Sequence, residues 1–418
     1  MKKVLIIAHF WPYRNGSGRV IGLAKYLPEF GWHPIILTGP LQKKTEQQFS
    51  VIETPCPDVV EFWKKKVGLH PKEDIKEQLG ASSKRSSFEF LLRLFGAIVC
   101  YPDRNKWWKK YAIDAGNELL EKGDIDAMIS IWPVTSHIIA KKLKAMHKIP
   151  WIADLPDPWS QNHNYSYGPL RKMMDKRLEL KTLLSADALT TVTQPWAENL
   201  RTLHKRKSVS AITHGFDPNT LYISPPNLTA KFTITYTGQI YTERQDPSKL
   251  FVALRDLISD GTMDQDDVEV RFYGSKDGWL TSVINEYGLL SIAKQYGTVS
   301  REISFEKQKE SQLILLLNWE DQRERGVCPL KTFEYLAAQR PILATGGFGN
   351  DVVETLLEET NAGVYAKEVE DIKSILRELY SEYKSKGEIR YTGDTEKINK
   401  YSYREMARKF ADVLELSI

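Results

Sequence analysis

The chain has 418 residues, more than the roughly 100–200 of an average domain, so two or three domains are expected. Its residues are 42% hydrophobic and 27% charged, which excludes a disordered or collagen-like chain as a whole. Lys and Arg (58) exceed Asp and Glu (54) by only four, which argues against a dedicated nucleic-acid-binding protein. The three cysteines, Cys56, Cys100 and Cys328, form no CxxC pair, so we expect reduced thiols and a cytoplasmic protein.

The N-terminus reads as a first strand, because the apolar run Val4–Phe10 is interrupted by His9 and followed by Pro12 and Arg14. No run approaches the roughly 20 apolar residues that span a bilayer. In chain order, short buried strands alternate with helix-period segments such as Val20–Phe30 and Ser136–Met146. The predicted strands are Val4–Ala8, Ile35–Thr38, Ala127–Ile131, Trp151–Asp154 and Ala188–Thr193. This alternation predicts an open parallel sheet covered by helices on both faces.

A second alternation follows the turn-rich stretch Ser224-Pro-Pro-Asn227. Its predicted strands are Phe232–Tyr236, Val268–Tyr273, Leu313–Leu317 and Ile342–Ala344, with helices such as Pro247–Ser259 and Lys331–Ala338 between them. We therefore expect an α/β chain of two doubly wound domains, residues 1–222 and 228–398. The last element, residues 399–418, is predicted as a helix with the apolar stripe Tyr403, Met406, Phe410, Val413 and Leu414.

The segment Glu61–Tyr111 is unlike its surroundings, with twelve Lys and Arg residues against six Asp and Glu. Aromatic residues are interleaved with these charges, and Phe88–Cys100 is strongly apolar. Two interpretations stay open. In the first, Phe88–Cys100 is a core helix flanked by solvated lysines. In the second, the segment contacts an anionic membrane surface.

Two stretches suggest anion binding. Gly16 and Gly18 follow the first strand and open a helix, where backbone amides can approach a phosphate. The alternative there is a plain strand-to-helix turn. In the second stretch, Pro329 leads into a helix that starts near Lys331, with Thr332 next and Glu334 on the same helical face. A lysine there can hold a diphosphate and the carboxylate can accept ribose hydroxyls. The alternative is an exposed Lys–Glu pair.

The second stretch also resembles a family signature. Pro329-Leu-Lys-Thr-Phe-Glu-Tyr-Leu-Ala337 with Pro341-Ile-Leu-Ala344 is similar to the C-terminal motif of GT4-like retaining glycosyltransferases of the GT-B fold. Other stretches agree in order over nearly the whole chain: Gly16–Arg19, Phe30-Gly-Trp32, Pro133–His137, Pro150–Trp159, Gly215-Phe-Asp217 and Tyr236-Thr-Gly238.

The resemblance implies two Rossmann-like domains facing across a cleft, with the final helix crossing back to the first domain. It implies a UDP- or GDP-linked sugar donor and transfer, with retention, to a glycan or lipid-linked acceptor in cell-surface polysaccharide or glycolipid biosynthesis. No other cofactor, no metal ion and no nucleic acid is implied. The protein would be cytoplasmic or peripheral on the inner face of the cell membrane.

The resemblance also assigns residue roles. The donor diphosphate would meet Gly16, Gly18, Arg244, Lys331 and Thr332. Glu334 would hold the ribose, and the loop from Gly297 to Val299 would face the base. His137 and Asp157 are the candidate catalytic residues, the latter in a loop after a strand, where open α/β sheets bind ligands. His137 can also be read as a satisfied core residue.

The sequence departs from the family pattern at three places. Gly326 stands eight positions before Glu334, where a first glutamate is usual, and Glu324 lies two residues earlier. Pro156 and Gln239 replace basic residues. Two other functions therefore stay open, a GT-B nucleotide-sugar epimerase and a non-catalytic relative that binds nucleotide-sugar or membrane. The sequence contains no His-Glu-x-x-His, Gly-x-Ser-x-Gly or Walker motif, which argues against zinc-peptidase, serine-hydrolase and P-loop chemistry.

Overall fold

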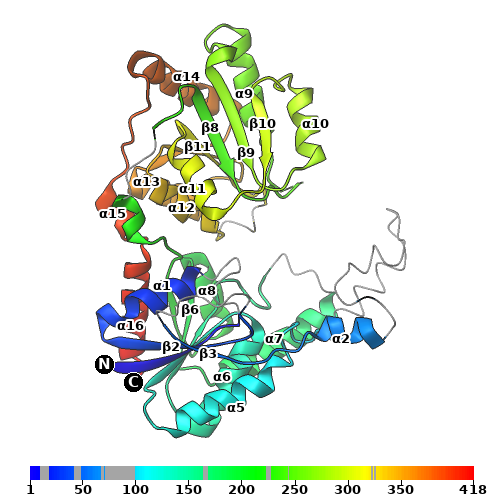
Figure 1. Cartoon of the computed structure of the whole chain (residues 1–418), viewed down its shortest axis with the longest axis vertical. Helices are drawn as coiled ribbons and strands as arrows, with labels where there is room; N and C mark the ends of the chain where they lie inside the picture. The colour runs from blue at the N-terminus through cyan, green and yellow to red at the C-terminus, as the bar shows by residue number, and fades with distance from the viewer. Residues whose placement is uncertain are drawn as a thin grey trace. The chain divides into compact units, whose positions relative to one another are not determined.

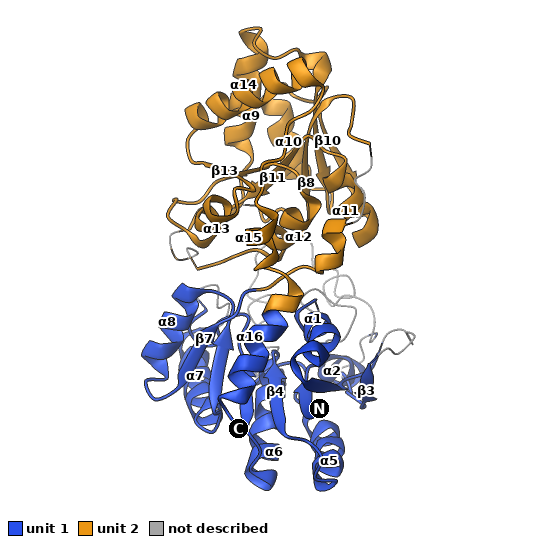
Figure 2. Cartoon of the chain, turned by 90° about the vertical axis from the view of Figure 1, so that its left-hand side faces the viewer, with its two compact units in different colours: residues 1–213, 406–418 blue, residues 214–405 orange. Residues whose placement is uncertain are grey.

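The computed structural model describes residues 1–9, 18–41, 49–66, 70, 99–162, 168–222, 227–242, 244–321, 323 and 326–418. These residues form two compact units, Met1–Thr213 with Met406–Ile418, and His214–Glu405 (Figure 2). The stretch 223–226, which contains most of the predicted linker, lies outside the described residues.

The first unit is built on a seven-stranded sheet with the order β3-β2-β1-β4-β5-β6-β7, in which all neighbours are parallel (Figure 1). Its strands are β1 (Lys2–Ile7), β2 (Trp32–Thr38), β3 (Ser50–Glu53), β4 (Ala127–Ile131), β5 (Trp151–Asp154), β6 (Ala188–Thr191) and β7 (Ser208–Ala211). Its helices are α1 (Gly18–Tyr26), α2 (Val59–Lys66), α5 (Trp108–Glu121), α6 (Val134–His147), α7 (Pro169–Leu183), α8 (Gln194–Leu203) and most of α16 (Tyr403–Glu415), with a 3₁₀ turn over Leu27–Phe30.

A buried ion pair holds the core of the first unit. Arg19 of α1 donates from Nε to Asp154 Oδ2 at the end of β5 (2.6 Å), and both side chains are fully buried. The same guanidinium donates to the carbonyl oxygens of Ile212 and Thr213 and lies 4.9 Å from the Phe410 ring centroid of α16. One residue therefore ties α1, the carboxyl edge of the sheet and the returning C-terminal helix together.

The second unit repeats the plan with a six-stranded parallel sheet of order β10-β9-β8-β11-β12-β13. Its strands are β8 (Phe232–Thr237), β9 (Val268–Tyr273), β10 (Ala293–Gly297), β11 (Leu313–Leu317), β12 (Ile342–Thr345) and β13 (Gly363–Ala366). Its helices are α9 (Ser248–Ser259), α10 (Gly278–Glu286), α11 (Arg301–Lys309), α12 (Leu330–Ala338), α13 (Val352–Thr360), α14 (Val369–Lys386) and α15 (Thr395–Asn399), with 3₁₀ turns over Pro218–Tyr222 and Gln265–Asp267.

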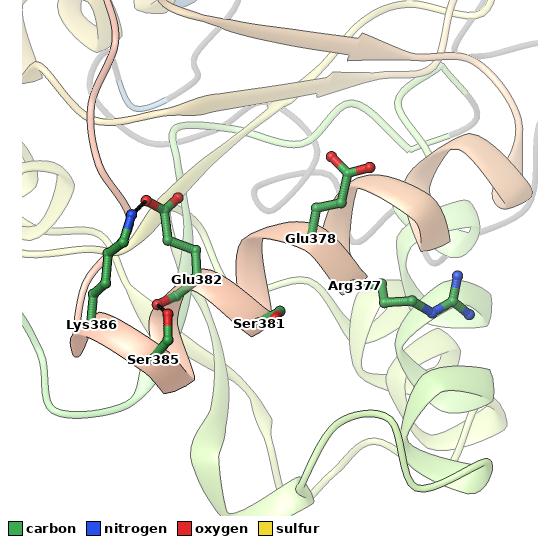
Figure 3. A pocket seen from close by; sticks show the side chains of 6 residues that line it. All are labelled: Arg377, Glu378, Ser381, Glu382, Ser385 and Lys386. Carbon is green, nitrogen blue, oxygen red and sulfur yellow. Dashed lines mark hydrogen bonds and ion pairs between the residues drawn. The ribbon is translucent and has the colours of Figure 1, made fainter.

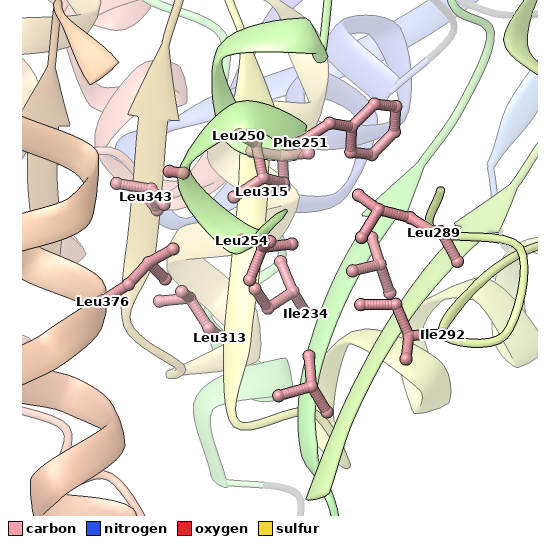
Figure 4. Close-up of a cluster of buried hydrophobic side chains, with 14 of the residues drawn as sticks. Ile234, Leu250, Phe251, Leu254, Leu289, Ile292, Leu313, Leu315, Leu343 and Leu376 are labelled. Carbon is pink, nitrogen blue, oxygen red and sulfur yellow. The ribbon is translucent and has the colours of Figure 1, made fainter. Parts of the chain in front are cut away.

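The strand β11 shows why its sequence has no polar alternation. Leu313 and Leu315 pack with Leu254 of α9 and Leu376 of α14 on one face (Figure 4). Ile314 and Leu316 belong to a second cluster, which α12 and α13 complete on the other face. A parallel strand covered on both faces must be apolar throughout.

These features confirm the predicted α/β class and each of the nine predicted strands. Four strands, β3, β7, β10 and β13, were not predicted, and each lies at an edge of its sheet. The predicted helix Val20–Phe30 is shorter than expected. The α-helix ends at Tyr26 and a 3₁₀ turn over Leu27–Phe30 follows, because Pro28 has no amide to donate to the preceding turn. The predicted C-terminal helix is α16, and its apolar stripe is buried.

Candidate functional site

The carboxyl ends of the strands in the second unit meet at one edge of the sheet, where glycines allow close packing. The Gly238 amide donates to the Tyr273 carbonyl oxygen (2.7 Å), and the Gly274 amide donates to the Gly297 carbonyl oxygen (3.0 Å). A Cβ atom on Gly274 would lie 2.2 Å from the Gly238 oxygen, and Gly238 has a φ of +111°. No larger residue fits there, so the backbones of β8, β9 and β10 approach closely at this edge.

Lys331 occupies the centre of this edge. It lies in the first turn of α12, and its Nζ donates a short hydrogen bond to Tyr236 Oη and sits 4.0 Å from the centroid of that ring. A Cβ on Gly238 would be 3.0 Å from the same nitrogen, so glycine leaves room for the ammonium. Burial lowers the pKa of Lys331 to about 7, while the Glu334 carboxylate acts in the opposite direction.

These features favour an anionic ligand next to Lys331. The first amides of an α-helix have no partner within the helix, and its N-terminus carries partial positive charge. A diphosphate placed there would meet the partial positive charge of the helix N-terminus and the ammonium together. Thr332, predicted beside Lys331, is fully buried, and its amide donates to Pro329 O (2.9 Å).

Glu334 lies one turn further along α12 and is paired with Arg301, a cation that was not predicted from the sequence. Arg301 Nη2, at the first residue of α11, is 2.9 Å from Glu334 Oε1. Arg301 also has a hydrogen bond to the Tyr403 side chain. The predicted base-facing residues Gly297 and Val299 directly precede Ser300, which caps α11. The structure thus brings Glu334, Arg301 and the 297–299 loop together.

Arg244, predicted near the diphosphate, stacks on an aromatic ring. Its guanidinium carbon is 4.9 Å from the centroid of Trp319, which follows β11, and its carbonyl accepts the Glu320 amide (3.0 Å). Tyr241 contacts the same ring at 5.3 Å.

A hollow of about 320 Å³, counting space open to solvent, adjoins Trp319. It is lined by Asn318, Trp319, Asp321, Val327, Pro329, Gly347, Phe348 and Asp351. The Asn318 amide donates to Asp351 Oδ2 (3.0 Å), and Pro329 caps α12, so the hollow borders the Lys331 helix. Apart from Pro329, none of these residues was predicted from the sequence. The Gly346-Gly347 pair after a predicted strand was the one available signal.

His137 of the first unit is fully buried in α6. Its Nδ1 is 2.7 Å from Ser130 Oγ, to which the Trp151 indole also donates (2.8 Å), and its ring stacks 6.3 Å from Trp159. Its Nε2 has no hydrogen-bond partner among the described residues. Burial lowers the pKa of His137 to about 3, so the ring is neutral at physiological pH.

Asp157, two residues before Trp159, is exposed in the turn after β5. Gly18 is the first residue of α1. Gly16, Glu324 and most of the segment 61–111, including 88–98, lie outside the described residues.

No group of three or more His, Cys, Asp or Glu side chains is arranged to hold a metal ion in the described part of the chain. Among those residues, no helix is long and apolar enough to cross a membrane. A further wide hollow is lined by Arg377, Glu378, Ser381, Glu382, Ser385 and Lys386 of α14 (Figure 3). It contains none of the predicted site residues.

No protein-family model and no curated protein matches the chain. Solved structures match over its full length. Sucrose-phosphate synthase from Thermosynechococcus elongatus superposes with a TM-score of 0.63 at 13% identity, covering 100% of this chain and 99% of that one. A trehalose-6-phosphate structure from E. coli bound with UDP-2-fluoro glucose gives 0.59 at 12%, with 100% of both chains covered. A putative UDP-N-acetylglucosamine 2-epimerase from Listeria monocytogenes gives 0.50 at 11%, covering 99% and 96%. The fold is GT-B.

Proposed function

We propose that the protein is a retaining, metal-independent glycosyltransferase. It would move a sugar from a UDP- or GDP-linked donor to a glycan or lipid-linked acceptor, in cell-surface polysaccharide or glycolipid biosynthesis on the cytoplasmic side of the membrane. The observation that carries the proposal is Lys331, whose ammonium is held against Gly238 at the N-terminus of α12. The GT-B fold supports it, and one structure of that fold holds a UDP-linked sugar.

In the proposed reaction, the bond between the anomeric carbon and the diphosphate breaks while an acceptor hydroxyl adds to that carbon from the same face and passes its proton to the departing diphosphate. The departing diphosphate gains negative charge. Lys331 and the α12 N-terminus are already in place to stabilise that charge, so little reorganisation is needed when it develops.

The proposed diphosphate contacts are Gly16, Gly18, Arg244, Lys331 and Thr332, and the proposed ribose and base contacts are Glu334, Gly297 and Val299. His137 and Asp157 remain the proposed catalytic residues. Since burial keeps the His137 ring neutral, we assign it hydrogen bonding rather than a positive charge.

The epimerase alternative keeps support from a putative epimerase of the same fold, because the fold alone does not separate the two activities. Incubation with a panel of UDP- and GDP-sugars, with and without lipid-linked acceptors, tests both. Transfer predicts a glycosylated acceptor and free nucleoside diphosphate. Epimerisation predicts an isomeric nucleotide-sugar without any acceptor. Failure of every nucleotide-sugar to bind in a thermal-shift screen would contradict both.

A further inference from the structure

The helix α7 of the first unit buries acidic side chains and exposes large apolar ones. Its buried face carries Asp175, Glu179 and Thr182 beside Leu183, and each carboxylate has a partner, Arg171 of the same helix for Asp175 and Ser160 for Glu179. Arg171 Nε donates to Asp175 Oδ2 (3.0 Å), and Glu179 Oε2 accepts the Ser160 amide (3.0 Å). The acidic residues of this helix are therefore fixed toward the protein and away from solvent.

The solvent face of α7 combines large apolar side chains with cations. The exposed apolar residues are Leu170, Met173, Met174 and Leu180, with Leu184 directly after the helix, and Leu170 and Leu184 are 67% and 72% exposed. Arg177 and Lys181 fall on the same stripe, because positions three and four apart share a helical face. Lys172 and Lys176 are exposed beside it. Every exposed charge of α7 is positive, and no described carboxylate forms an ion pair with these four cations.

The α14 helix of the second unit shows what an ordinary surface helix in this protein looks like. It buries Ile372, Leu376, Tyr380 and Tyr383, and its solvent face mixes Arg377 and Lys386 with Glu378 and serines (Figure 3). None of its large apolar side chains is exposed. Isolated exposed apolar residues are normal on protein surfaces, but five along one helix form a patch.

We propose that α7 is a docking surface for an anionic phospholipid bilayer. The apolar side chains would enter the headgroup region, where Arg177 and Lys181 can extend their charged ends to lipid phosphates. The charge selects this occupant, because a face with four cations and no exposed carboxylate complements an anionic surface. The docking would serve the lipid-linked acceptor of the proposed function, but membrane binding does not depend on catalysis.

The buried polar face makes the orientation of α7 specific. Turning the helix to hide its apolar stripe would also bury Arg177 and Lys181. It would break the contacts that Glu179 makes with the Ser160 amide and the His204 ring, which come from other elements. The helix is thus held with the apolar stripe outward by the bonds of Glu179 to other elements of the unit.

Cosedimentation of the full chain with vesicles, without donor or acceptor, tests the proposal. Vesicles of phosphatidylcholine with phosphatidylglycerol should bind the protein at about 0.1 M salt and release it at about 1 M, where the Debye length falls from about 10 Å to about 3 Å. Pure phosphatidylcholine should bind weakly. Removing two cations with Arg177→Gln/Lys181→Gln should weaken binding roughly tenfold to thirtyfold, at about 1 kcal/mol per cation. The matched control, Arg377→Gln/Lys386→Gln on α14, should bind as the parent does.

Leu170→Ser/Leu184→Ser tests the apolar part, and because both side chains are exposed the thermal midpoint should not change. This variant should also bind less. Binding of the α7 variants equal to that of the parent would overturn the proposal, as would no binding of the parent to anionic vesicles. A parent dimer that the Leu170 and Leu184 changes convert to monomer would assign the face to a second copy instead. Sugar transfer to a soluble acceptor by a parent that ignores vesicles would overturn the docking and leave the proposed function standing.

Discussion

Both units place charged residues at the carboxyl ends of the strands of a parallel sheet, but these residues have different roles. In the first unit, Arg19 and Asp154 are fully buried and bonded to each other. In the second unit, Lys331 is half-buried at a helix N-terminus, and Arg301 pairs with Glu334 with 65% and 33% of their side chains exposed. A charge at the carboxyl ends of these strands can therefore either hold the fold together or stay available to a ligand. Burial and partners decide which.

The largest effect is expected from breaking the buried pair. Arg19→Met removes the cation and leaves Asp154 buried without its partner, which should lower the free energy of unfolding by about 3–5 kcal/mol. Denaturant unfolding measures this. Arg19→Met/Asp154→Leu, which removes both charges, should recover much of the loss.

The matched control is an exposed pair in the same unit. Arg408 and Asp412 of α16 are 2.9 Å apart with 44% and 60% of their side chains exposed. Arg408→Ala should change the free energy of unfolding by less than about 1 kcal/mol. Equal losses for Arg19→Met and Arg408→Ala would contradict the structural role of the Arg19 pair.

Lys331→Ala should have the opposite effect to Arg19→Met, because it should leave the fold intact and weaken the binding of a ligand. A hydrogen bond to a charged group contributes about 1.5–3 kcal/mol, so nucleoside diphosphate affinity should fall about tenfold to a hundredfold. Calorimetry on the folded variant measures this affinity, and Lys294→Ala on the edge strand β10 is the control. Unchanged affinity would remove Lys331 from the diphosphate site.

The pH dependence of binding is a second test of the assignment of Lys331 to the diphosphate site. In the free protein, burial lowers the Lys331 pKa to about 7, and a bound diphosphate should raise it. The complex therefore takes up a proton, and affinity should be highest below pH 7 and fall as the pH rises above it. Calorimetry in two buffers of different ionisation enthalpy should detect this proton uptake. Lys331→Ala should lose this pH dependence.

The central strands of each sheet were predictable from the sequence, whereas the edge strands β3, β7, β10 and β13 were not, and the reason is physical. β11 is apolar at every position because helices cover both of its faces. β10 reads Ala-Lys-Gln-Tyr-Gly, with Lys294 and Tyr296 exposed, because one side of an edge strand meets solvent. Hydrophobic runs identify strands only where burial is complete.

The candidate site was predictable to the extent that it is local in sequence. Lys331 and Glu334 share one helix and one motif, so spacing alone placed them together. Their partners come from elsewhere. Tyr236 lies 95 residues from Lys331, and Arg301 comes from the preceding helix. Nothing in the sequence near His137 shows that Ser130 and Trp159 enclose its ring.

Smaller effects on affinity should distinguish the role of Glu334 from that of its partner Arg301. Glu334→Gln replaces a charged acceptor with a neutral one, so nucleoside diphosphate affinity should fall about fivefold. Arg301→Ala should instead leave the affinity unchanged or raise it by up to about threefold, because a partly exposed ion pair contributes only about 1 kcal/mol and its loss frees the carboxylate. Calorimetry on both variants decides. Equal weakening by both would mean that the ligand contacts Arg301 rather than the Glu334 carboxylate.

The smallest effect is expected at His137, where the fully buried ring should not titrate in the working range. Because burial lowers its pKa to about 3, the ring stays neutral from pH 5 to 8, and His137→Gln should leave the shape of the pH–rate profile unchanged even where it lowers the rate. NMR of the ring protons should show no shift over that range. An inflection near pH 6–7 that the variant loses would show that His137 becomes charged during turnover. In that case the first unit would also present a charge to the ligand, and its difference from the second unit would disappear at that residue.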